Sequence, residues 1–251
     1  MGQAVIGEAL AKGHQIVGAV EAKGNPNIDK SLREMGFPNS DICIVGTDKL
    51  YDAVEEADVY ISFTTPNAEV QNLPLVAELG KPIVLGTTGF SQEQNRVVHN
   101  AIERLVPVVF SPNFSVGVNM LFKLAEVLKS MPPEYTFSIS EIHHTAKKDA
   151  PSGTALKLGE IVAGVRGYTT TVHAREGISV RKVDELEIVA MRAGGVPGIH
   201  DLIVAGPYEM LRIEHTAFSR NVLAQGAVMA AEWLRKQQNP GIYSMATVLG
   251  L

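Results

Sequence analysis

The sequence lacks the features that mark secreted, membrane-spanning or nucleic-acid-binding proteins. Its one cysteine, Cys43, cannot form an internal disulfide, and no apolar run approaches the ~20 residues that span a bilayer. No block of Lys and Arg interrupts a formal net charge of −5, so a nucleic-acid surface is not expected. No signal-peptide pattern opens the sequence. We therefore expect a cytoplasmic protein in which Cys43, within the apolar run 42–45, is a buried thiol.

The first half of the sequence alternates short apolar runs with helical patterns. The apolar runs, which we predict to be strands, cover 15–20, 42–45, 59–63, 83–85 and 106–110. The helical patterns cover 5–10, 28–35, 49–56, 67–79 and 92–105. Continuously apolar strands joined by helices through short connections are typical of a parallel sheet with helices on both faces. The fold class predicted is therefore α/β.

Polar residues and glycines follow these strands, at the edge where parallel sheets bind ligands. Glu21 follows the first strand and could accept hydrogen bonds from the ribose of a dinucleotide, or be a solvated strand-end carboxylate. The turn 86–89, Gly-Thr-Thr-Gly, allows close backbone approach to a ligand, although a plain strand-to-helix turn has the same composition. These two features alone do not decide between the alternatives.

A dinucleotide-binding unit begins with a strand and a G-x-G-x-x-G turn ahead of its first helix. Here the first helical pattern follows Met1 directly, and Gly2 stands where the last glycine of that turn would stand. The helix N-terminus that would face a pyrophosphate therefore lacks most of the glycine-rich turn that would surround the phosphates. A late start of the sequence and a protein without a phosphate loop are both consistent with this pattern.

The second half has a different organisation. A helical pattern covers 116–128, strand patterns cover 168–174, 179–183, 186–192, 201–205 and 210–216, and a last helical pattern covers 221–234. The strands are joined by turns, which predicts a largely antiparallel sheet. The boundary between the two architectures falls near 113–115.

The segment 139–155 holds an unusual density of titratable and hydrogen-bonding groups. If a strand continues through His143, then Glu141 and His143 share one face and His144 takes the other. One imidazole could transfer a proton and the other could hold a ligand, while Lys147 could fix a carboxylate. The residues that open the following helix, with free backbone N–H groups and two hydroxyls, form an anion site: Ser152, Gly153 and Thr154.

Other chemistries fit this segment less well. A His-His pair can bind metal, but no further ligand stands at metal spacing, so no metal site is expected. Lys148 is expected to be solvated and Asp149 to be a turn or cap residue. Ser152 lies outside a G-x-S-x-G elbow and is not expected to be a nucleophile.

The segment closely resembles a motif of the 4-hydroxy-tetrahydrodipicolinate reductase family, with the residues His143-His144-x-x-Lys147-x-Asp149-x-Pro151-Ser152-Gly153-Thr154-Ala155. The resemblance extends along the chain through Glu21, Phe63-Thr64, the glycine turn 86–90, the segment 113–119, Arg192-Ala193-Gly194, His200, His215 and Ser219-Arg220. It implies a Rossmann-like domain at 1–113 and 221–251. It also implies a smaller α+β domain at 114–220 that binds substrate and forms a homotetramer.

The same resemblance implies a reaction of lysine and diaminopimelate biosynthesis, in which NADH or NADPH reduces 4-hydroxy-tetrahydrodipicolinate to tetrahydrodipicolinate. His143 would donate the proton and Lys147 would assist. The dicarboxylate substrate would be held by His144, Lys147, Ser152, Gly153 and Thr154. The cofactor would be held by Gly2, Glu21, Phe63, Thr64, Gly86, Thr87, Thr88, Ser111, Asn113, Phe114 and Arg220.

Glu21 would oppose a 2′-phosphate, which favours NADH over NADPH. Two alternative functions remain open at this stage. One is a nicotinamide-dependent dehydrogenase of another amino-acid-derived substrate. The other is a non-catalytic dicarboxylate-binding protein that has lost its cofactor loop.

Overall fold

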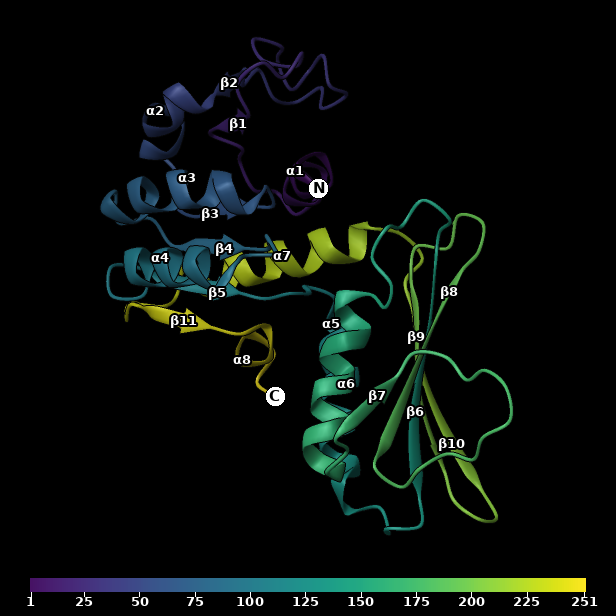
Figure 1. Ribbon diagram of the computed structural model, residues 1–251. Coiled ribbons are helices and arrows are strands. Elements are labelled where there is room, and N and C mark those ends of the chain that lie inside the picture. Colours follow the sequence, from purple (N-terminus) through teal and green to yellow (C-terminus); the bar gives the residue numbers. More distant parts are fainter. The chain divides into compact units, whose positions relative to one another are not determined.

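The computed structural model describes residues 1–251, which form two compact units (Figure 1). The first unit comprises Met1–Phe114 and Leu223–Gly250, and the second comprises Ser115–Val222 together with Leu251. No helix combines the length and the apolar character needed to cross a membrane.

Parallel strands form the centre of the first unit, in two separate sheets. The larger sheet has the order β11-β5-β4-β3, with β3 at Tyr60–Ser62, β4 at Ile83–Leu85, β5 at Pro107–Phe110 and β11 at Gly241–Tyr243. The smaller sheet pairs β1 (Ala19–Glu21) with β2 (Ile44–Gly46). Every pairing in both sheets is parallel.

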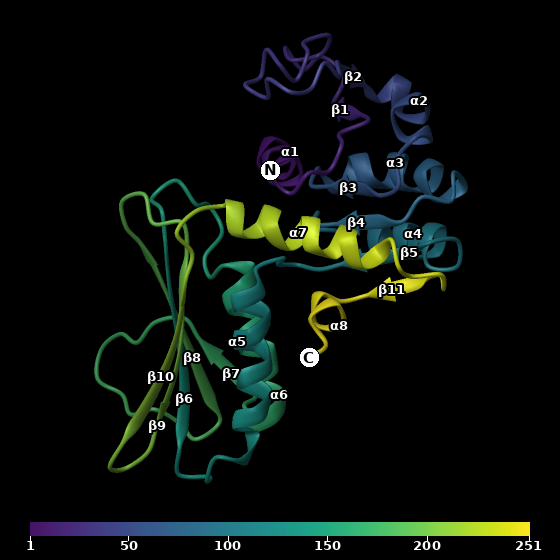
Figure 2. The same cartoon turned by 180° about the vertical axis from the view of Figure 1, so that it is seen from behind.

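Helices cover both faces of the larger sheet. Helices α3 and α4 lie on one face and α7 on the other, as the two opposite views show (Figures 1 and 2). The helices of this unit are α1 (Gly2–Ala11), α2 (Leu50–Glu55), α3 (Pro66–Glu78), α4 (Gln92–Ile102), α7 (Asn221–Leu234) and α8 (Met245–Leu249), with a 3-10 turn η1 at Thr47–Lys49. Ser91 caps α4 through a capping box with Gln94, which satisfies N–H groups that a helix start leaves unpaired.

The core of the first unit forms where α2, α3 and α4 meet the sheet. It contains Leu73, Val76, Ile83, Leu85 and Val108, all fully buried. Continuously apolar strands suit this position because both sheet faces are covered.

The second unit contains a mixed sheet with the order β10-β9-β6-β8-β7. Its strands are β6 (Thr136–His143), β7 (Thr170–Val172), β8 (Glu185–Arg192), β9 (Ile199–Ala205) and β10 (Met210–Thr216). Strand β9 is antiparallel to β6 and β10, whereas β8 is parallel to β6 and β7. Helices α5 (Val116–Val127) and α6 (Gly153–Arg166), with a 3-10 turn η2 at Leu128–Ser130, cover one face of this sheet (Figures 1 and 2).

The predicted α/β class, with a Rossmann-like parallel sheet and a second mixed sheet, is confirmed. The helix predicted at 28–35 is wrong. This segment forms successive turns, because Asp29 has a φ of +68° and Gly36 a φ of +96°, and its only strand-like pairing is a bridge from Ser31 to Cys43. Cys43 is exposed rather than buried, since it lies before β2 and not inside the sheet.

Two predicted strands also differ. The segment 179–183 forms no strand, and its apolar side chains Val180 and Val183 are almost fully exposed, as is the neighbouring Ile178. The predicted strand 15–20 is assigned only as β1, from Ala19 onward, while 15–18 remain outside any strand. In both cases the apolar run is present but a neighbouring strand to pair with it is not.

Candidate active site

A buried carboxylate lies at the end of β6. Burial alternates along this strand, so that Phe137, Ile139, Glu141 and His143 share the covered face, as the period of the sequence predicts. Glu141 is completely buried. A carboxylate without water must find donors within the protein, because an unpaired buried charge is strongly destabilising.

Three elements supply the donors to Glu141. The ring Nδ1 of His143, on the same strand, hydrogen-bonds to Oε2. The backbone N–H of Ser152, at the start of α6, donates to Oε1 over 3.0 Å. The guanidinium of Arg192, on β8, donates to Oε1 over 3.1 and 3.2 Å. Glu141 therefore joins the end of β6, the start of α6 and the end of β8.

The strand register brings these groups together. Strands β6 and β8 are parallel, with His143 opposite Arg192. The pairing continues beyond the strands, because the N–H of Ala193 donates to the carbonyl of His143 over 2.8 Å. Arg192 also donates to the carbonyl of Asp149 over 2.5 Å, which ties down the loop between β6 and α6.

Glu141 fixes the orientation of the His143 ring. Because the carboxylate accepts from Nδ1–H, the other ring nitrogen, Nε2, is left to a substrate. Nε2 faces Gly198, where a Cβ would lie only 3.1 Å away. Burial lowers the pKa of His143, the hydrogen bond to Glu141 opposes that shift, and the positive charges of Lys147 and Arg192 lower the pKa further.

His143 is the first of three histidine rings in a row. The His143 and His200 centroids are 5.1 Å apart, and those of His200 and His215 are 6.2 Å apart. Nε2 of His200 lies 3.1 Å from the hydroxyl of Ser152. Burial, reinforced by the charges of His143 and His215, lowers the pKa of His200 to about 3. His200 is therefore neutral near pH 7 and is a poor candidate for the proton donor.

The start of α6 provides N–H groups beside these rings. Ser152 caps the helix, its hydroxyl accepting from the N–H of Ala155 over 3.2 Å. Gly153 follows and is exposed, with no atom within 4 Å of the position that a Cβ would take. The first N–H groups of a helix have no partner within it, so the exposed Gly153 offers a donor to an anion.

Cationic side chains accompany this helix start. Nζ of Lys147 lies 2.9 Å from Oδ1 of Asp149, and the Lys147 side chain is only 21% exposed. The charge of Lys147 lowers the pKa of both His143 and His200, so it acts close to both rings. Nε2 of His144 lies 3.5 Å from a guanidinium nitrogen of Arg220. The second unit thus combines a titratable imidazole with several groups suited to carboxylates.

The sequence-predicted residues occupy different places in this arrangement. His143 and Ser152 meet at Glu141, and Lys147 lies close to the histidine rings. Sequence reasoning gave no role to Glu141, Arg192, His200 or His215. Arg192, His200 and His215 had a sequence signal in their place in the order of the family's motifs. Glu141 had one in its place on the buried face of an alternating strand, where an acid requires partners.

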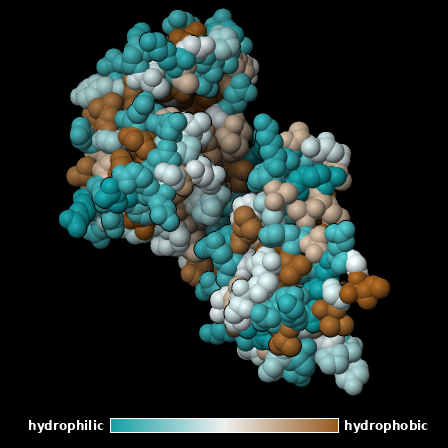
Figure 3. Space-filling view, in the orientation of Figure 1, coloured by the Kyte–Doolittle hydropathy of each residue, from teal (hydrophilic) through white to brown (hydrophobic).

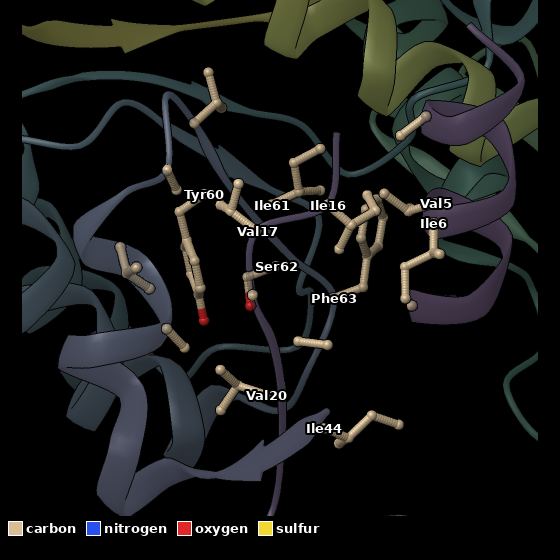
Figure 4. Close-up of a pocket in the computed structure, with 18 of the residues that line it drawn as sticks. Val5, Ile6, Ile16, Val17, Val20, Ile44, Tyr60, Ile61, Ser62 and Phe63 are labelled. Atoms are coloured by element: carbon tan, nitrogen blue, oxygen red, sulfur yellow. The ribbon is translucent and has the colours of Figure 1, made fainter. Parts of the chain in front are cut away.

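In the first unit, Gly2, Glu21, Phe63 and Thr64 line a cavity of about 770 Å³ (Figure 4). Glu21 is exposed at the carboxyl end of β1, where its Oε2 accepts from the side-chain amide of Asn25 over 3.0 Å. The first turn of α1 has no side-chain cap. An exposed carboxylate and uncapped N–H groups at the carboxyl edge fit the ribose and phosphates of a nicotinamide dinucleotide, the group that the resemblance implies.

A second buried carboxylate, missed from the sequence, joins the ends of β3 and β4. Oε1 of Glu69 accepts hydrogen bonds from the hydroxyls of Ser62 and Thr64, each over 2.6 Å, and from that of Thr87 over 2.5 Å. The N–H of Thr64 donates to Thr87 over 2.8 Å. Oε2 of Glu69 is buried without a partner. Thr64 and Thr87 are therefore held together at the edge where a parallel sheet binds ligands.

The remaining predicted cofactor residues mainly contact one another. A Cβ at Gly86 would lie 2.1 Å from the ring of Phe63, which packs edge-to-face against Phe114 at 5.5 Å. The hydroxyl of Ser111 donates to the carbonyl of Asn113 over 2.8 Å. Two further residues stand apart from this group: Thr88 is exposed, and Arg220 belongs to the second unit.

The buried histidines predict acid sensitivity. The pKa of His200 is about 3 in the folded chain and about 6.5 in the unfolded chain. Its contribution to the free energy of unfolding is therefore complete above about pH 6.5 and is lost as the pH falls toward 3. We expect this residue alone to remove about 2 kcal/mol of unfolding free energy between roughly pH 7.5 and pH 5. Denaturant unfolding of His200→Asn should show a correspondingly shallower pH dependence. The exposed His173→Asn should behave as the parent chain, and an unchanged slope in His200→Asn would contradict the assignment.

Comparison with known proteins agrees with this geometry. Residues 1–114 match the family model "Dihydrodipicolinate reductase, N-terminus", and residues 117–249 match "Dihydrodipicolinate reductase, C-terminus". A 4-hydroxy-tetrahydrodipicolinate reductase of Trichlorobacter lovleyi is 38% identical over all of this chain and 95% of its own length. Another, of Methanosarcina barkeri, is 46% identical over 78% of this chain and 74% of its own length.

Solved structures share the fold. A dihydrodipicolinate reductase from Paenisporosarcina sp. TG-14, with dipicolinate bound, superposes with a TM-score of 0.75 at 22% identity, over 97% of this chain and 92% of its own. An amine dehydrogenase from Mycobacterium smegmatis gives a TM-score of 0.66 at 14% identity, over 98% and 92% of the two chains. With both family models together spanning nearly the whole sequence, the chain belongs to the dihydrodipicolinate reductase family.

Proposed function

We propose that this chain reduces 4-hydroxy-tetrahydrodipicolinate to tetrahydrodipicolinate with a nicotinamide dinucleotide, in lysine and diaminopimelate biosynthesis. The observation that carries the proposal is the buried imidazole of His143, oriented by Glu141 beside the start of α6. Relatives that carry the name of this activity align with the chain over most of their length, which supports it.

The substrate is a dicarboxylate, and the second unit has the groups to bind one. The exposed N–H of Gly153 at the α6 start would bind one carboxylate, with Lys147 as the countercharge and Thr154 as the neighbouring contact that the resemblance implies. His144 and Arg220 would form a second polar contact. The Ser152 hydroxyl is engaged by Ala155 and His200, so Ser152 contributes chiefly by setting the helix start.

His143 donates the proton in this proposal. Glu141 holds Nδ1, so a proton on Nε2 is the one that points away from the protein framework. Burial lowers the pKa of His143 in the free protein. A bound dicarboxylate brings negative charge to the ring and favours the imidazolium, so the acid forms when substrate is present. His200, which is neutral, packs edge-to-face against the His143 ring and adds no second positive charge beside it.

The cofactor supplies the hydride when bound. Glu21 would hold the adenosine ribose, the first turn of α1 would face the phosphates, and Thr64 and Thr87 would hold the nicotinamide end. Glu21 would repel a 2′-phosphate, so NADH is the preferred cofactor of the proposal.

An assay of the purified chain with each cofactor tests the function. The dihydronicotinamide absorbance should fall when substrate is added, with a higher kcat/KM for NADH than for NADPH. Calorimetric titration with dipicolinate provides the control. Binding of dipicolinate without turnover would instead favour a non-catalytic dicarboxylate-binding protein.

His143→Gln removes the proton donor while it keeps a hydrogen-bonding side chain. We expect kcat to fall about 10²- to 10³-fold with KM changed less than about threefold, because proton transfer acts in the transition state. Steady-state kinetics check this split. An unchanged kcat would eliminate His143 as the donor.

Lys147→Ala removes a charge that the substrate meets in both the ground state and the transition state. We expect KM to rise and kcat to fall, each about tenfold. The matched control is Lys148→Ala, since Lys148 is exposed and has no ion pair. Equal kinetics for the two variants would count against the role of Lys147.

We further propose that the chain forms a homotetramer through the loop between β7 and β8. Its apolar side chains Ile178, Val180 and Val183 lie exposed. Figure 3 shows apolar surface at the outer edge of the second unit, where this loop runs. Exposed apolar groups of this kind mark protein interfaces.

Light scattering after size exclusion tests the assembly. The parent chain should elute with a tetramer mass, and the double variant Ile178→Asp/Val180→Asp should elute as a smaller species. A parent chain that elutes as a monomer would contradict the proposal.

A further inference from the structure

Three hydroxyl groups in the first unit share one oxygen of a buried carboxylate. The hydroxyls of Ser62, Thr64 and Thr87 lie 2.6, 2.6 and 2.5 Å from Oε1 of Glu69. Oε2 of the same carboxylate is buried without a partner. Distances of about 2.5–2.7 Å are those at which a hydroxyl donates to an ionised oxygen. Glu69 therefore takes all three hydroxyl protons, because an ionised carboxylate only accepts.

The contacts of Thr87 agree with this direction. Its hydroxyl oxygen accepts the backbone N–H of Thr64 over 2.8 Å, which leaves its own proton for Glu69. Glu69 thus holds Thr64 twice, directly through the Thr64 hydroxyl and indirectly through the Thr64 backbone.

Of the three hydroxyls, that of Thr64 is the one that a ligand can reach. Ser62 and Thr87 are only 2% and 3% exposed. Thr64 is exposed and lines the cavity of the first unit, next to Ser62 and Phe63, which Figure 4 labels. It lies just beyond the carboxyl end of β3, at the edge where a parallel sheet binds ligands.

The hydrogen-bonding character of Thr64 follows from these contacts. A hydroxyl has one proton to donate and two lone pairs that accept. Glu69 takes the proton, and no group of the chain donates to the Thr64 oxygen. Thr64 therefore presents an acceptor, and no donor, to the cavity.

We propose that Glu69 is a positioning residue that makes the Thr64 hydroxyl an acceptor only, so that Thr64 selects a ligand with an N–H donor. The inference rests on the proposed function for the class of ligand. A nicotinamide dinucleotide carries a carboxamide, whose amino group is the donor that Thr64 accepts. An analogue with an acetyl group in its place keeps the carbonyl oxygen but has no N–H, and it leaves the Thr64 acceptor unpaired.

Glu69→Gln should change the direction of these hydrogen bonds. An amide nitrogen at the place of Oε2 would have no acceptor, whereas at the place of Oε1 it meets three hydroxyl oxygens. Buried N–H groups are left unpaired less often than buried carbonyl oxygens. We therefore expect the amide nitrogen to donate to the hydroxyls, which frees the Thr64 proton for a carbonyl oxygen of the ligand.

Calorimetric titration of the full chain with NADH and with its reduced 3-acetylpyridine analogue tests the inference without turnover. The parent chain should bind NADH about tenfold more tightly than the analogue. Thr64→Val keeps the side-chain shape without the hydroxyl, so the ratio of the two dissociation constants should fall to about one, whereas Thr64→Ser should keep the parent ratio. Glu69→Gln should lower the ratio to less than about threefold. Ser62→Ala is the matched control, since it removes a different hydroxyl from the same carboxylate oxygen, and it should keep the parent ratio.

The ratio separates this role from a purely structural one, because a distorted loop would weaken both ligands alike. Equal binding of the two ligands by the parent chain, or an unchanged ratio in Thr64→Val, would overturn the inference and leave the proposed function standing. A parent ratio in folded Glu69→Gln would overturn the role of Glu69. If that variant does not fold, Glu69→Asp takes its place, since it withdraws the carboxylate by one methylene, and a parent ratio there has the same meaning. Binding of neither ligand would contradict the proposed function and this inference together.

Discussion

The buried carboxylate of Glu141 is the constraint on which the second unit depends. It has no access to water, so its charge must be satisfied by protein donors. These come from the same strand in His143, from the α6 start in Ser152 and from β8 in Arg192. One buried carboxylate thereby ties the start of α6 to the end of β6 and orients the ring of the proposed proton donor. Loss of any donor would leave a buried charge partly unpaired, which is more costly than loss of an ordinary hydrogen bond.

The first unit repeats this principle at a different place. Glu69 is also completely buried, but neutral hydroxyls surround it rather than a guanidinium. Its three contacts join Ser62, the last residue of β3, with Thr64 and Thr87, which follow β3 and β4 at the carboxyl edge of the parallel sheet. In both units a buried carboxylate, which is not itself proposed to contact substrate or cofactor, holds in place the backbone and side chains that are proposed to do so. The groups proposed to contact substrate and cofactor are consequently loop residues held by rigid elements.

The sequence predicted what depends on local periodicity. The alternation along β6 placed Glu141 and His143 on one face, and the apolar runs located β3, β4 and β5. The sequence could not predict Arg192 as a partner of Glu141 or His200 as a neighbour of His143, because their proximity follows from the strand register between distant segments. It failed at 179–183, where an apolar run has no neighbouring strand. Pairing, rather than hydrophobicity, decides whether such a run becomes a strand.

The central claim is that Glu141 fixes the tautomer of His143, and nitrogen NMR of the chain with ¹⁵N-labelled histidine rings tests it most directly. At about pH 8, above the ordinary histidine pKa, the account predicts a neutral His143 that carries its proton on Nδ1. Assignment by comparison with His143→Gln identifies the resonance, and Glu141→Gln should abolish this preference. A His143 ring protonated on Nε2 in the parent chain would contradict the account.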